Sequence, residues 1–281
     1  IGLTQQLAHH RPHIGFHLWP GEGQRGPAHV DEPPPGDDAD VHMDARDPEV
    51  FGNPTFRILF GSMLLFTSAA GIHAALQNHN YVFVWKLRPE TMQVLSYANL
   101  TGILVGIPLT SMLLRRLEKK AVVTIGFGLV VVFWSLLPSL RASGLFTLSG
   151  SAALPWLAAS TLFAGIGAGL IFIAYPSMMA DAADEHEHRF SARREGLFFS
   201  GLGFAGKAAG GIGTLVGGFA LDLLRFPKEA GRQVDAVIPE DVLSHLVLAW
   251  GPLPAALCVL GGIVFAGVGT GIFAAGVEAC R

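Results

Sequence analysis

The sequence predicts an all-α integral membrane protein with six transmembrane helices. Hydrophobic residues make up 51% of the 281 positions and charged residues only 15%, a composition typical of multi-pass membrane proteins. Six apolar segments are each long enough to cross a bilayer, which takes ~20 helical residues. They cover approximately residues 56–84, 93–114, 120–140, 154–180, 196–224 and 243–275.

The first 53 residues differ from the rest of the chain. They hold six of the eleven histidines, the triple proline 33–35 and the acidic segment 37–40, without helical or strand periodicity. Such a segment buries too little apolar area to offset the entropy of ordering. We therefore expect a disordered cytoplasmic linker over 1–53 and a six-helix bundle over 54–281. Residues 1–26 resemble out-of-frame translation of a GC-rich gene, and the start at Ile1 leads us to expect a fragment.

The charges exclude some functions and predict an orientation. The net charge of −3 argues against a nucleic-acid partner, and Cys258 and Cys280 lack metal-ligand spacing, so no metal site is expected. Basic residues concentrate in the tight loop 115–120 and recur in 184–195, whereas those of the other loops are spread thinly. The positive-inside rule then places both ends of the bundle in the cytoplasm, with the protein in the cell (inner) membrane.

Polar residues follow one face of the first apolar segment. His73, Gln77 and Asn80 lie at positions i, i+4 and i+7 of a helix. Inside a membrane such a face meets protein or water instead of lipid. Two interpretations stay open: a cavity for hydroxylated ligands, or hydrogen bonds to neighbouring helices. Tyr97 in the second segment allows the same two interpretations.

The fourth segment ends in acidic residues. Asp181 and Asp184 are three residues apart, so they share one face of a helix. They lie in the helix, about one turn before the loop that follows it, so the arginines of this loop are within reach. We expect a cytoplasmic gate or ion-pair network, with a solvated loop face as the simpler alternative. The predicted network comprises Asp181, Asp184, Arg193, Arg194 and Glu195.

The fifth segment contains the most informative residue. The 26 residues between Glu195 and Asp222 include a single charge, Lys207. An ammonium group in mid-membrane costs roughly 2.5–3.5 kcal/mol, so it needs a partner carboxylate, a substrate or a water-filled pathway. Lys207 lies twelve residues beyond Glu195, which is ~18 Å along a helix and too far for the side chain to reach the interface. The residue predicts transport, with Lys207 facing a cavity.

Motifs of the fourth and fifth segments resemble those of one transporter family. They are Pro176-Ser177-Met178-Met179-Ala180-Asp181, Asp184-Glu185-His186-Glu187, Arg193-Arg194-Glu195-Gly196-Leu197-Phe198, Phe204-Ala205-Gly206-Lys207 and Leu221-Asp222. This pattern is similar to that of the glycoside–pentoside–hexuronide:cation symporters of the major facilitator superfamily, which include melibiose permease. The resemblance covers residues 53–275 approximately.

The resemblance implies a C-terminal six-helix bundle of a twelve-helix transporter. Such a transporter moves a sugar or glycoside together with H⁺ or Na⁺ by alternating access between two six-helix halves. Lys207 then matches a lysine beside the sugar and cation sites, and Asp181 and Asp184 match the acidic pair ending the family's tenth helix. Phe172 occupies the place of a tryptophan in melibiose permease and would stack on a sugar. Gly203 replaces a polar side chain there, which puts galactoside specificity in doubt.

Two other functions stay open. Asp181 and Asp184 with Gly196 are similar to the aspartates of membrane phosphatidyltransferases, so a membrane-embedded metal-dependent phosphotransferase is one alternative, although the further aspartate pair is missing. A non-transporting half that binds or scaffolds a partner is the other. For the symporter we expect no enzyme activity and no cofactor besides the coupling cation. Its expected partners are the lipid bilayer, a sugar as solute and a missing N-terminal six-helix half.

Overall fold

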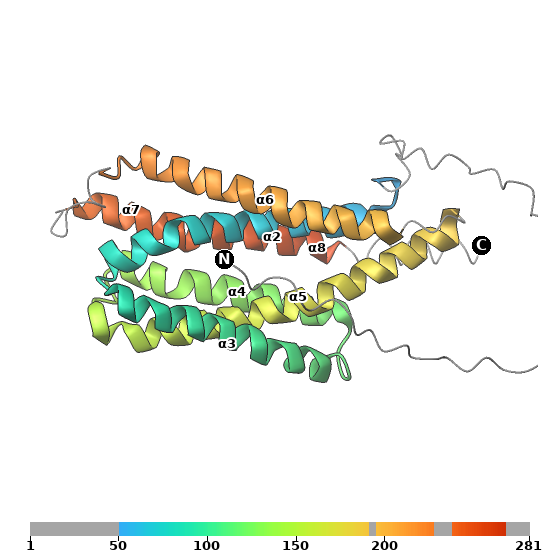
Figure 1. The fold of residues 1–281 in the computed structure, drawn as a ribbon, viewed down its shortest axis with the longest axis horizontal. Helices are drawn as coiled ribbons and strands as arrows, with labels where there is room; N and C mark the ends of the chain where they lie inside the picture. The colour runs from blue at the N-terminus through green and yellow to red at the C-terminus, as the bar shows by residue number, and fades with distance from the viewer. Residues whose placement is uncertain (1–50, 191–194, 228–237, 268–281) are drawn as a thin grey trace, which may run out of the picture. The chain divides into compact units, whose positions relative to one another are not determined.

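The computed structural model describes residues 51–190, 195–227 and 238–267, which form helices without any strand (Figure 1). Six stretches of these residues are long and apolar enough to cross a membrane, which confirms the all-α, six-span prediction. Residues 1–50 of the predicted linker lie outside the described residues. The elements are α2 (Pro54–His79), the π-helical η1 (Asn80–Val84), α3 (Pro89–Leu113), α4 (Lys119–Ala142), the short η2 (Gly150–Ala152), α5 (Leu154–Phe190), α6 (Glu195–Leu223), α7 (Glu240–Trp250) and α8 (Pro252–Ala266).

Helix α2 begins at residues that suit a helix N-terminus. The side-chain oxygen of Asn53 accepts hydrogen bonds from the backbone N–H groups of Thr55 (2.8 Å) and Phe56 (3.2 Å). Pro54 takes the first helical position, where its missing N–H is no loss. The amide nitrogen of Asn53 also donates to the carbonyl of Ala182 in α5, at 3.5 Å. The cap therefore fixes the start of α2 against the end of α5.

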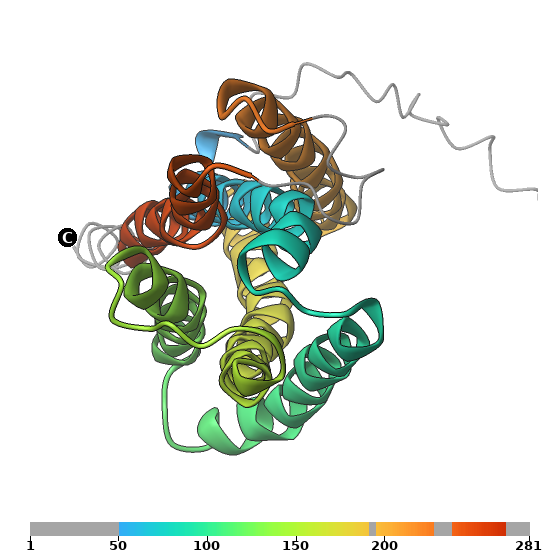
Figure 2. The same cartoon turned by 90° about the vertical axis from the view of Figure 1, so that its left-hand side faces the viewer.

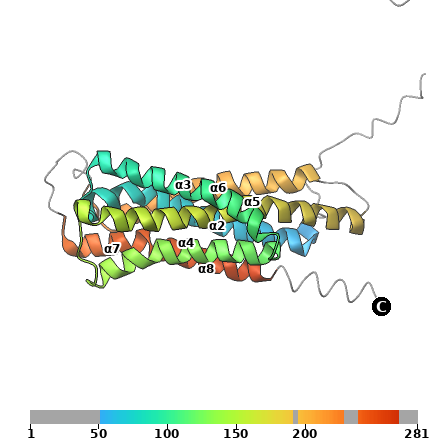
Figure 3. The same ribbon diagram turned by 90° about the horizontal axis from the view of Figure 1, so that it is seen from below.

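Successive spans run in opposite directions, so the described bundle has two ends (Figure 1). The turn between α3 and α4 defines the α3–α4 end, which also carries the start of α2 and the end of α5. The turn between α2 and α3 defines the α2–α3 end, which carries the end of α4 and the start of α7. Helix α5 extends well past its neighbours at the α3–α4 end (Figure 3), ten residues beyond the segment predicted to end at residue 180.

Glycines bring two pairs of helices into backbone contact. A Cβ added to Gly102 of α3 would lie 2.1 Å from the Leu162 carbonyl oxygen of α5. A Cβ added to Gly213 of α6 would lie 2.2 Å from the Ser68 carbonyl oxygen of α2. No side chain fits at either distance, so these contacts require glycine. The α3–α5 and α2–α6 pairs are the closest associations in the described bundle.

The helices are arranged in an arc when seen along the bundle (Figure 2). Helices α6, α2, α5 and α3 follow one another along it, while α4, α7 and α8 lie on its outer side. Helix α6 packs mainly on α2 and α3 mainly on α5, whereas α4 lies between α5 and α8. Helices α3 and α6 therefore keep long exposed faces among the described residues.

The core consists of two apolar clusters, one toward each end. The cluster near the α3–α4 end includes Phe56, Leu59, Tyr175 and Phe198. The cluster near the α2–α3 end is rich in aromatic rings, among them Tyr81, Trp85 and Trp250. Each end of the described bundle thus has its own set of buried side chains.

The last span differs from the predicted continuous segment 243–275. Helix α7 ends at Trp250 and α8 starts at Pro252, so the span is broken at Gly251. A Cβ on Gly251 would lie 2.4 Å from the Pro138 ring and 2.6 Å from the Trp134 carbonyl oxygen, both in α4. The break therefore lets the last span approach α4 closely. Residues beyond 267 lie outside the described ranges.

Candidate functional site

Lys207 lies in the middle of α6, on a face that no other helix covers in the described structure. The side chain is exposed, and it forms no ion pair or hydrogen bond with another described residue. Ser200, Gly211, Thr214 and Gly218 are exposed on the same side of α6. We call this side the open face. It combines small and polar residues with one cation, at membrane depth.

The opposite side of α6 is packed against α2. After Phe198, its buried residues recur every four positions: Ala205, Ala209, Gly213 and Gly217. Lys207 lies two residues from both Ala205 and Ala209, which is roughly 160° to 200° around a helix. Close packing of the small side chains therefore determines that Lys207 points away from α2.

His73 lies on the side of α2 that faces α4 and α7, away from α6. Its ring is stacked between Trp134 of α4 (4.2 Å between centroids, 3° between planes) and Trp250 of α7 (4.9 Å, 21°). Its Nδ1 atom lies 3.0 Å from the Trp250 carbonyl oxygen. The adjacent cavity, of about 20 Å³, has room for about one water molecule. The structure thus places His73 in an aromatic cluster and does not bring it to Lys207.

Asn80 also bonds to neighbouring backbone. Its side-chain amide donates to the carbonyls of Leu76 (3.1 Å) and of Leu246 in α7 (3.5 Å). Gln77 is half-buried, and its side chain forms no hydrogen bond with another described residue. Of the two interpretations of the polar face, hydrogen bonding between helices describes His73 and Asn80.

Tyr97 and Phe172 lie on different helices, and both are accessible. Tyr97 of α3 is exposed, and its hydroxyl accepts a hydrogen bond from the Gln93 amide at 3.0 Å. Phe172 of α5 is about half exposed, and its ring meets the edge of Phe66 of α2 at 6.5 Å between centroids. Both rings have free surface in the described structure, and the sugar stacking that the resemblance implies for Phe172 stays a prediction.

Lys119 forms an ion pair with Asp181 at the α3–α4 end. Its Nζ lies 2.8 Å and 2.7 Å from the two carboxylate oxygens, and the pair joins α4 to α5. A second polar contact lies nearby, where the Thr55 hydroxyl of α2 donates to the Glu185 carboxylate of α5 at 2.9 Å. Sequence reasoning used the loop of Lys119 only for orientation. It missed Lys119 as the partner of Asp181, since the folding of α4 onto α5 brings the two together.

For the other residues of the predicted ion-pair network, the structure gives exposure or no description. Asp184 is exposed on α5, and Glu195 is exposed at the first position of α6. Arg193 and Arg194 lie outside the described residues. Among the residues that the structure describes, no group of three or more His, Cys, Asp or Glu side chains could hold a metal ion.

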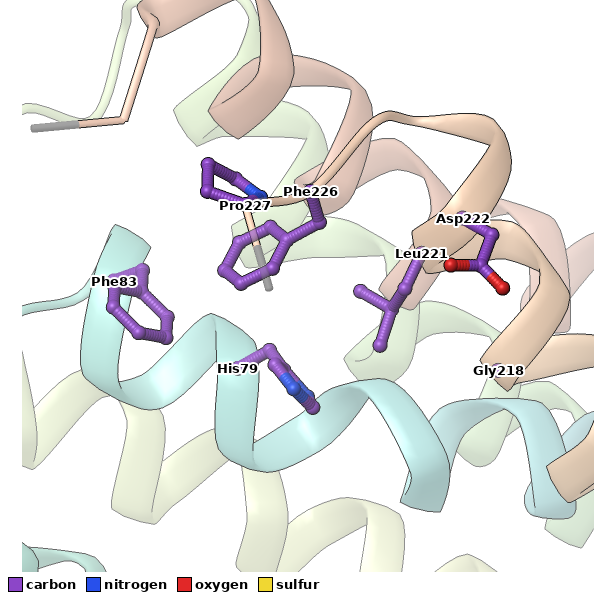
Figure 4. A pocket seen from close by; sticks show the side chains of 7 residues that line it. All are labelled: His79, Phe83, Gly218, Leu221, Asp222, Phe226 and Pro227. Atoms are coloured by element: carbon purple, nitrogen blue, oxygen red, sulfur yellow. The ribbon is translucent and has the colours of Figure 1, made fainter. Parts of the chain in front are cut away.

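A pocket of about 350 Å³ lies at the α2–α3 end, between α2–η1 and the end of α6 (Figure 4). The Phe226 ring meets those of His79 and Phe83 edge to face, at 5.4 and 5.1 Å between centroids. Asp222 lies on the far side of Leu221 (Figure 4). The volume of this pocket is within the range of small-molecule sites, and its lining is mainly apolar. The full lining is His79, Phe83, Gly218, Leu221, Asp222, Phe226 and Pro227.

This pocket and Lys207 share the open face of α6. Gly218 lines the pocket and lies eleven residues after Lys207, which is ~16 Å along a helix. Sequence reasoning missed the pocket, because Phe83 lies at the end of the first apolar segment, Phe226 lies just after the fifth, and neither carries a polar signal. Their proximity depends on the α2–α6 contact.

A buried hydroxyl pair was also missed. The Tyr175 hydroxyl of α5 donates to the Leu59 carbonyl of α2 and lies within hydrogen-bond distance of the Ser62 hydroxyl. All three residues are buried in the cluster near the α3–α4 end. The pair links α2 to α5 at a depth where an unpaired hydroxyl would be costly. The only sequence signal is a tyrosine inside an apolar run.

Comparison with known proteins gives a family and a relative. A family model described as "MFS/sugar transport protein" matches residues 37–267. The chain is 24% identical over 220 residues to an "uncharacterized symporter" from Synechocystis sp.. That alignment covers 77% of the chain and 38% of the relative, so the chain spans well under half the length of the curated relative that it matches.

Proposed function

The chain belongs to the MFS/sugar transport protein family, and from this membership we propose that it forms the C-terminal six-helix half of a sugar symporter. Family membership identifies a transporter and not the phosphotransferase weighed from Asp181 and Asp184. The proposed reaction moves a sugar or glycoside together with H⁺ or Na⁺ by alternating access. The relative's name, which includes the word symporter, supports cation coupling.

The exposed Lys207 in mid-helix is the observation that carries this proposal. A lipid-facing ammonium at this depth is costly, so the open face of α6 is best explained by a polar pathway. In that pathway Lys207 is a positive counter-charge. It stabilises a bound solute or a carboxylate when the coupling cation is absent, and it competes with the cation when that is present. Because of this competition, binding of the cation affects binding of the solute.

The missing half would complete the pathway. Helices α3 and α6 have exposed faces at the two ends of the arc (Figure 2), where six further helices would enclose a central site. Tyr97 and Phe172 have accessible rings on α3 and α5 for contact with the sugar. The pocket of Phe83 and Phe226 would receive the solute on the α2–α3 side. With the basic loops inside, the α2–α3 end faces the exterior, and the α3–α4 end, where α2 begins and α8 ends, faces the cytoplasm.

The Lys119–Asp181 ion pair supports a cytoplasmic gate. It joins α4 to α5 at the end where the inward-facing opening would form. Both side chains are partly exposed, at 37% and 59%, so the pair is weak enough to break and re-form during transport. In a scaffold that does not transport, the Lys119–Asp181 ion pair would have no reason to break and re-form.

Uptake by the complete transporter tests the proposal. The genomic DNA upstream of the Ile1 codon, read in three frames, should encode six further apolar helices, and the joined sequence is then expressed. We expect Lys207→Ala to abolish cation-dependent sugar uptake while membrane insertion stays intact. Arg88→Ala, an exposed basic residue at the helix end, is the control and should keep uptake. Normal coupled uptake by the Lys207 variant would overturn the role of Lys207. No flux by the complete unsubstituted protein would favour a scaffold.

A further inference from the structure

A second pocket, of about 410 Å³, lies at the α2–α3 end between η1, the end of α4 and the start of α7. It shares only Phe83 with the pocket of Figure 4. Its lining differs in chemistry, because it contains three charged side chains. The lining residues are Phe83, Val84, Lys86, Arg141, Ala142, Gly144, Thr147, Glu240, Leu243, Ser244 and Val247.

Two cationic side chains and one carboxylate line this pocket. Lys86 and Arg141 carry positive charge and Glu240 negative charge, yet none of them is in an ion pair with another described residue. Arg141 is held in place: its Nη1 donates to the Phe146 carbonyl at 3.3 Å, and its guanidinium lies 5.8 Å from the centre of the Trp85 ring. A pre-positioned guanidinium with a nearby ammonium is suited to a phosphate group.

The pocket lies at the depth of lipid headgroups. Lys119 and Arg141 are 22 residues apart in α4, which is ~33 Å along the helix, while the hydrocarbon core is ~30 Å thick. If Lys119 is at one interface, Arg141 is at the other. Trp156 is exposed at the same end and contacts Phe146 edge to face, as expected of an interfacial aromatic residue.

The pocket is also on the side where lipids are available. Helices α4 and α7 lie on the outer side of the arc, away from the exposed faces of α3 and α6 (Figure 2). At this depth and on this side, the abundant phosphate is that of phospholipid headgroups.

We propose that this pocket binds the phosphate of an anionic phospholipid headgroup. Lys86 and Arg141 provide the charge-assisted contacts, and the Thr147 hydroxyl is placed to donate a further hydrogen bond. Glu240 beside them opposes binding, so the net charge of the pocket is tuned to one phosphate. The site is separate from Lys207 and does not depend on transport.

Lipid retention tests the site on the chain itself. The chain is placed in nanodiscs of phosphatidylcholine and phosphatidylglycerol, transferred to detergent, and the retained phosphatidylglycerol is counted by native mass spectrometry. Each basic residue near an anionic headgroup is worth about a fivefold change in affinity. We expect Lys86→Gln and Arg141→Gln each to lower retention about fivefold, and Glu240→Gln to raise it. Added salt should weaken retention.

Arg88→Gln is the matched control, since Arg88 is exposed two residues from Lys86 and does not line the pocket. Lys86 is itself exposed, so its substitution leaves the core intact. Equal retention by the Lys86 and Arg88 variants would overturn the proposal. In a second arm, inorganic phosphate is titrated onto the chain in phosphatidylcholine nanodiscs. Saturable phosphate binding without phosphatidylglycerol retention would overturn the lipid as the source of the phosphate.

Discussion

The two faces of α6 contain the same small residues but meet different surroundings. On the packed face, a Cβ on Gly213 or Gly217 would lie 2.2 or 2.6 Å from atoms of α2. On the open face, Gly203, Gly211 and Gly218 have no neighbouring atom within 4 Å of a Cβ position. Helix packing within the described bundle therefore explains the glycines of one face only. Those of the other face, like Lys207, would meet the second six-helix half that we propose.

The largest expected effect breaks the packed face. Gly213→Leu places a side chain where the Ser68 carbonyl oxygen already lies, so α6 must separate from α2. Overpacking of this kind costs typically 1–3 kcal/mol, and more when the obstacle is backbone. We expect a large drop in the thermal unfolding temperature of the purified chain. Gly203→Leu, on the open face, is the control and should change it little. Equal losses in the two variants would contradict the distinction between the faces.

Removing the charge from the open face should make membrane insertion of α6 more favourable. Lys207→Leu replaces a cation with an apolar side chain, which favours membrane insertion of α6 by about 3 kcal/mol. A glycosylation-mapping assay of the isolated α6 segment measures this change. Thr214→Leu serves as the neutral comparison. Unchanged insertion of the Lys207 variant would show that the ammonium is not at membrane depth.

Cysteine labelling sharpens the comparison at single residues. Thr214→Cys on the open face should react with a small maleimide much faster than Ala209→Cys on the packed face, where the residue is buried. Cys258 is buried and should not interfere, and Cys280 is first replaced by Ser. Similar rates at the two positions in the folded chain would mean that α6 does not keep its packed face against α2.

The smallest expected effect lies away from α6. Asp181→Asn removes the ion pair with Lys119, and pairs this exposed contribute at most about 1 kcal/mol. We expect a small, salt-dependent fall in the free energy of unfolding, measured in denaturant. Asp184→Asn, which removes an exposed carboxylate on the same helix, should have no such effect. A large loss from Asp181→Asn alone would mean that ion pairing and not packing holds α4 on α5.

The sequence was sufficient to identify the six spans and the single charge inside the fifth span. A membrane span is a local property, because ~20 consecutive apolar residues identify it without knowledge of its neighbours. A single charged residue within such an apolar run, as in α6, is visible in the same way. Helix ends were harder. The π-helical η1 depends on how α2 approaches other helices. The break at Gly251 has a local signal in the Gly251-Pro252 pair, which the predicted continuous segment 243–275 did not use.

The contacts between helices were not available from the sequence. His73 was expected on a polar face with Gln77 and Asn80, but which neighbour this face meets depends on the arrangement of all six spans. The two tryptophans that stack on His73 come from α4 and α7. Lys119 was likewise missed as the partner of Asp181, because 62 residues separate them in sequence. Sequence patterns indicate which residues need a partner, while the fold decides which partner they find.

Helix α5 offers a practical route to imaging. Its 37 residues extend ~55 Å, about 25 Å more than the hydrocarbon core, so its last turns stand outside the bilayer (Figure 3). A protein of 29.8 kDa embedded in a detergent belt gives cryo-electron micrographs few features for particle alignment. A soluble helical protein joined in helical register to the last turn of α5 would extend this helix outside the bilayer. The extended helix would carry the orientation of the membrane domain to a visible external marker.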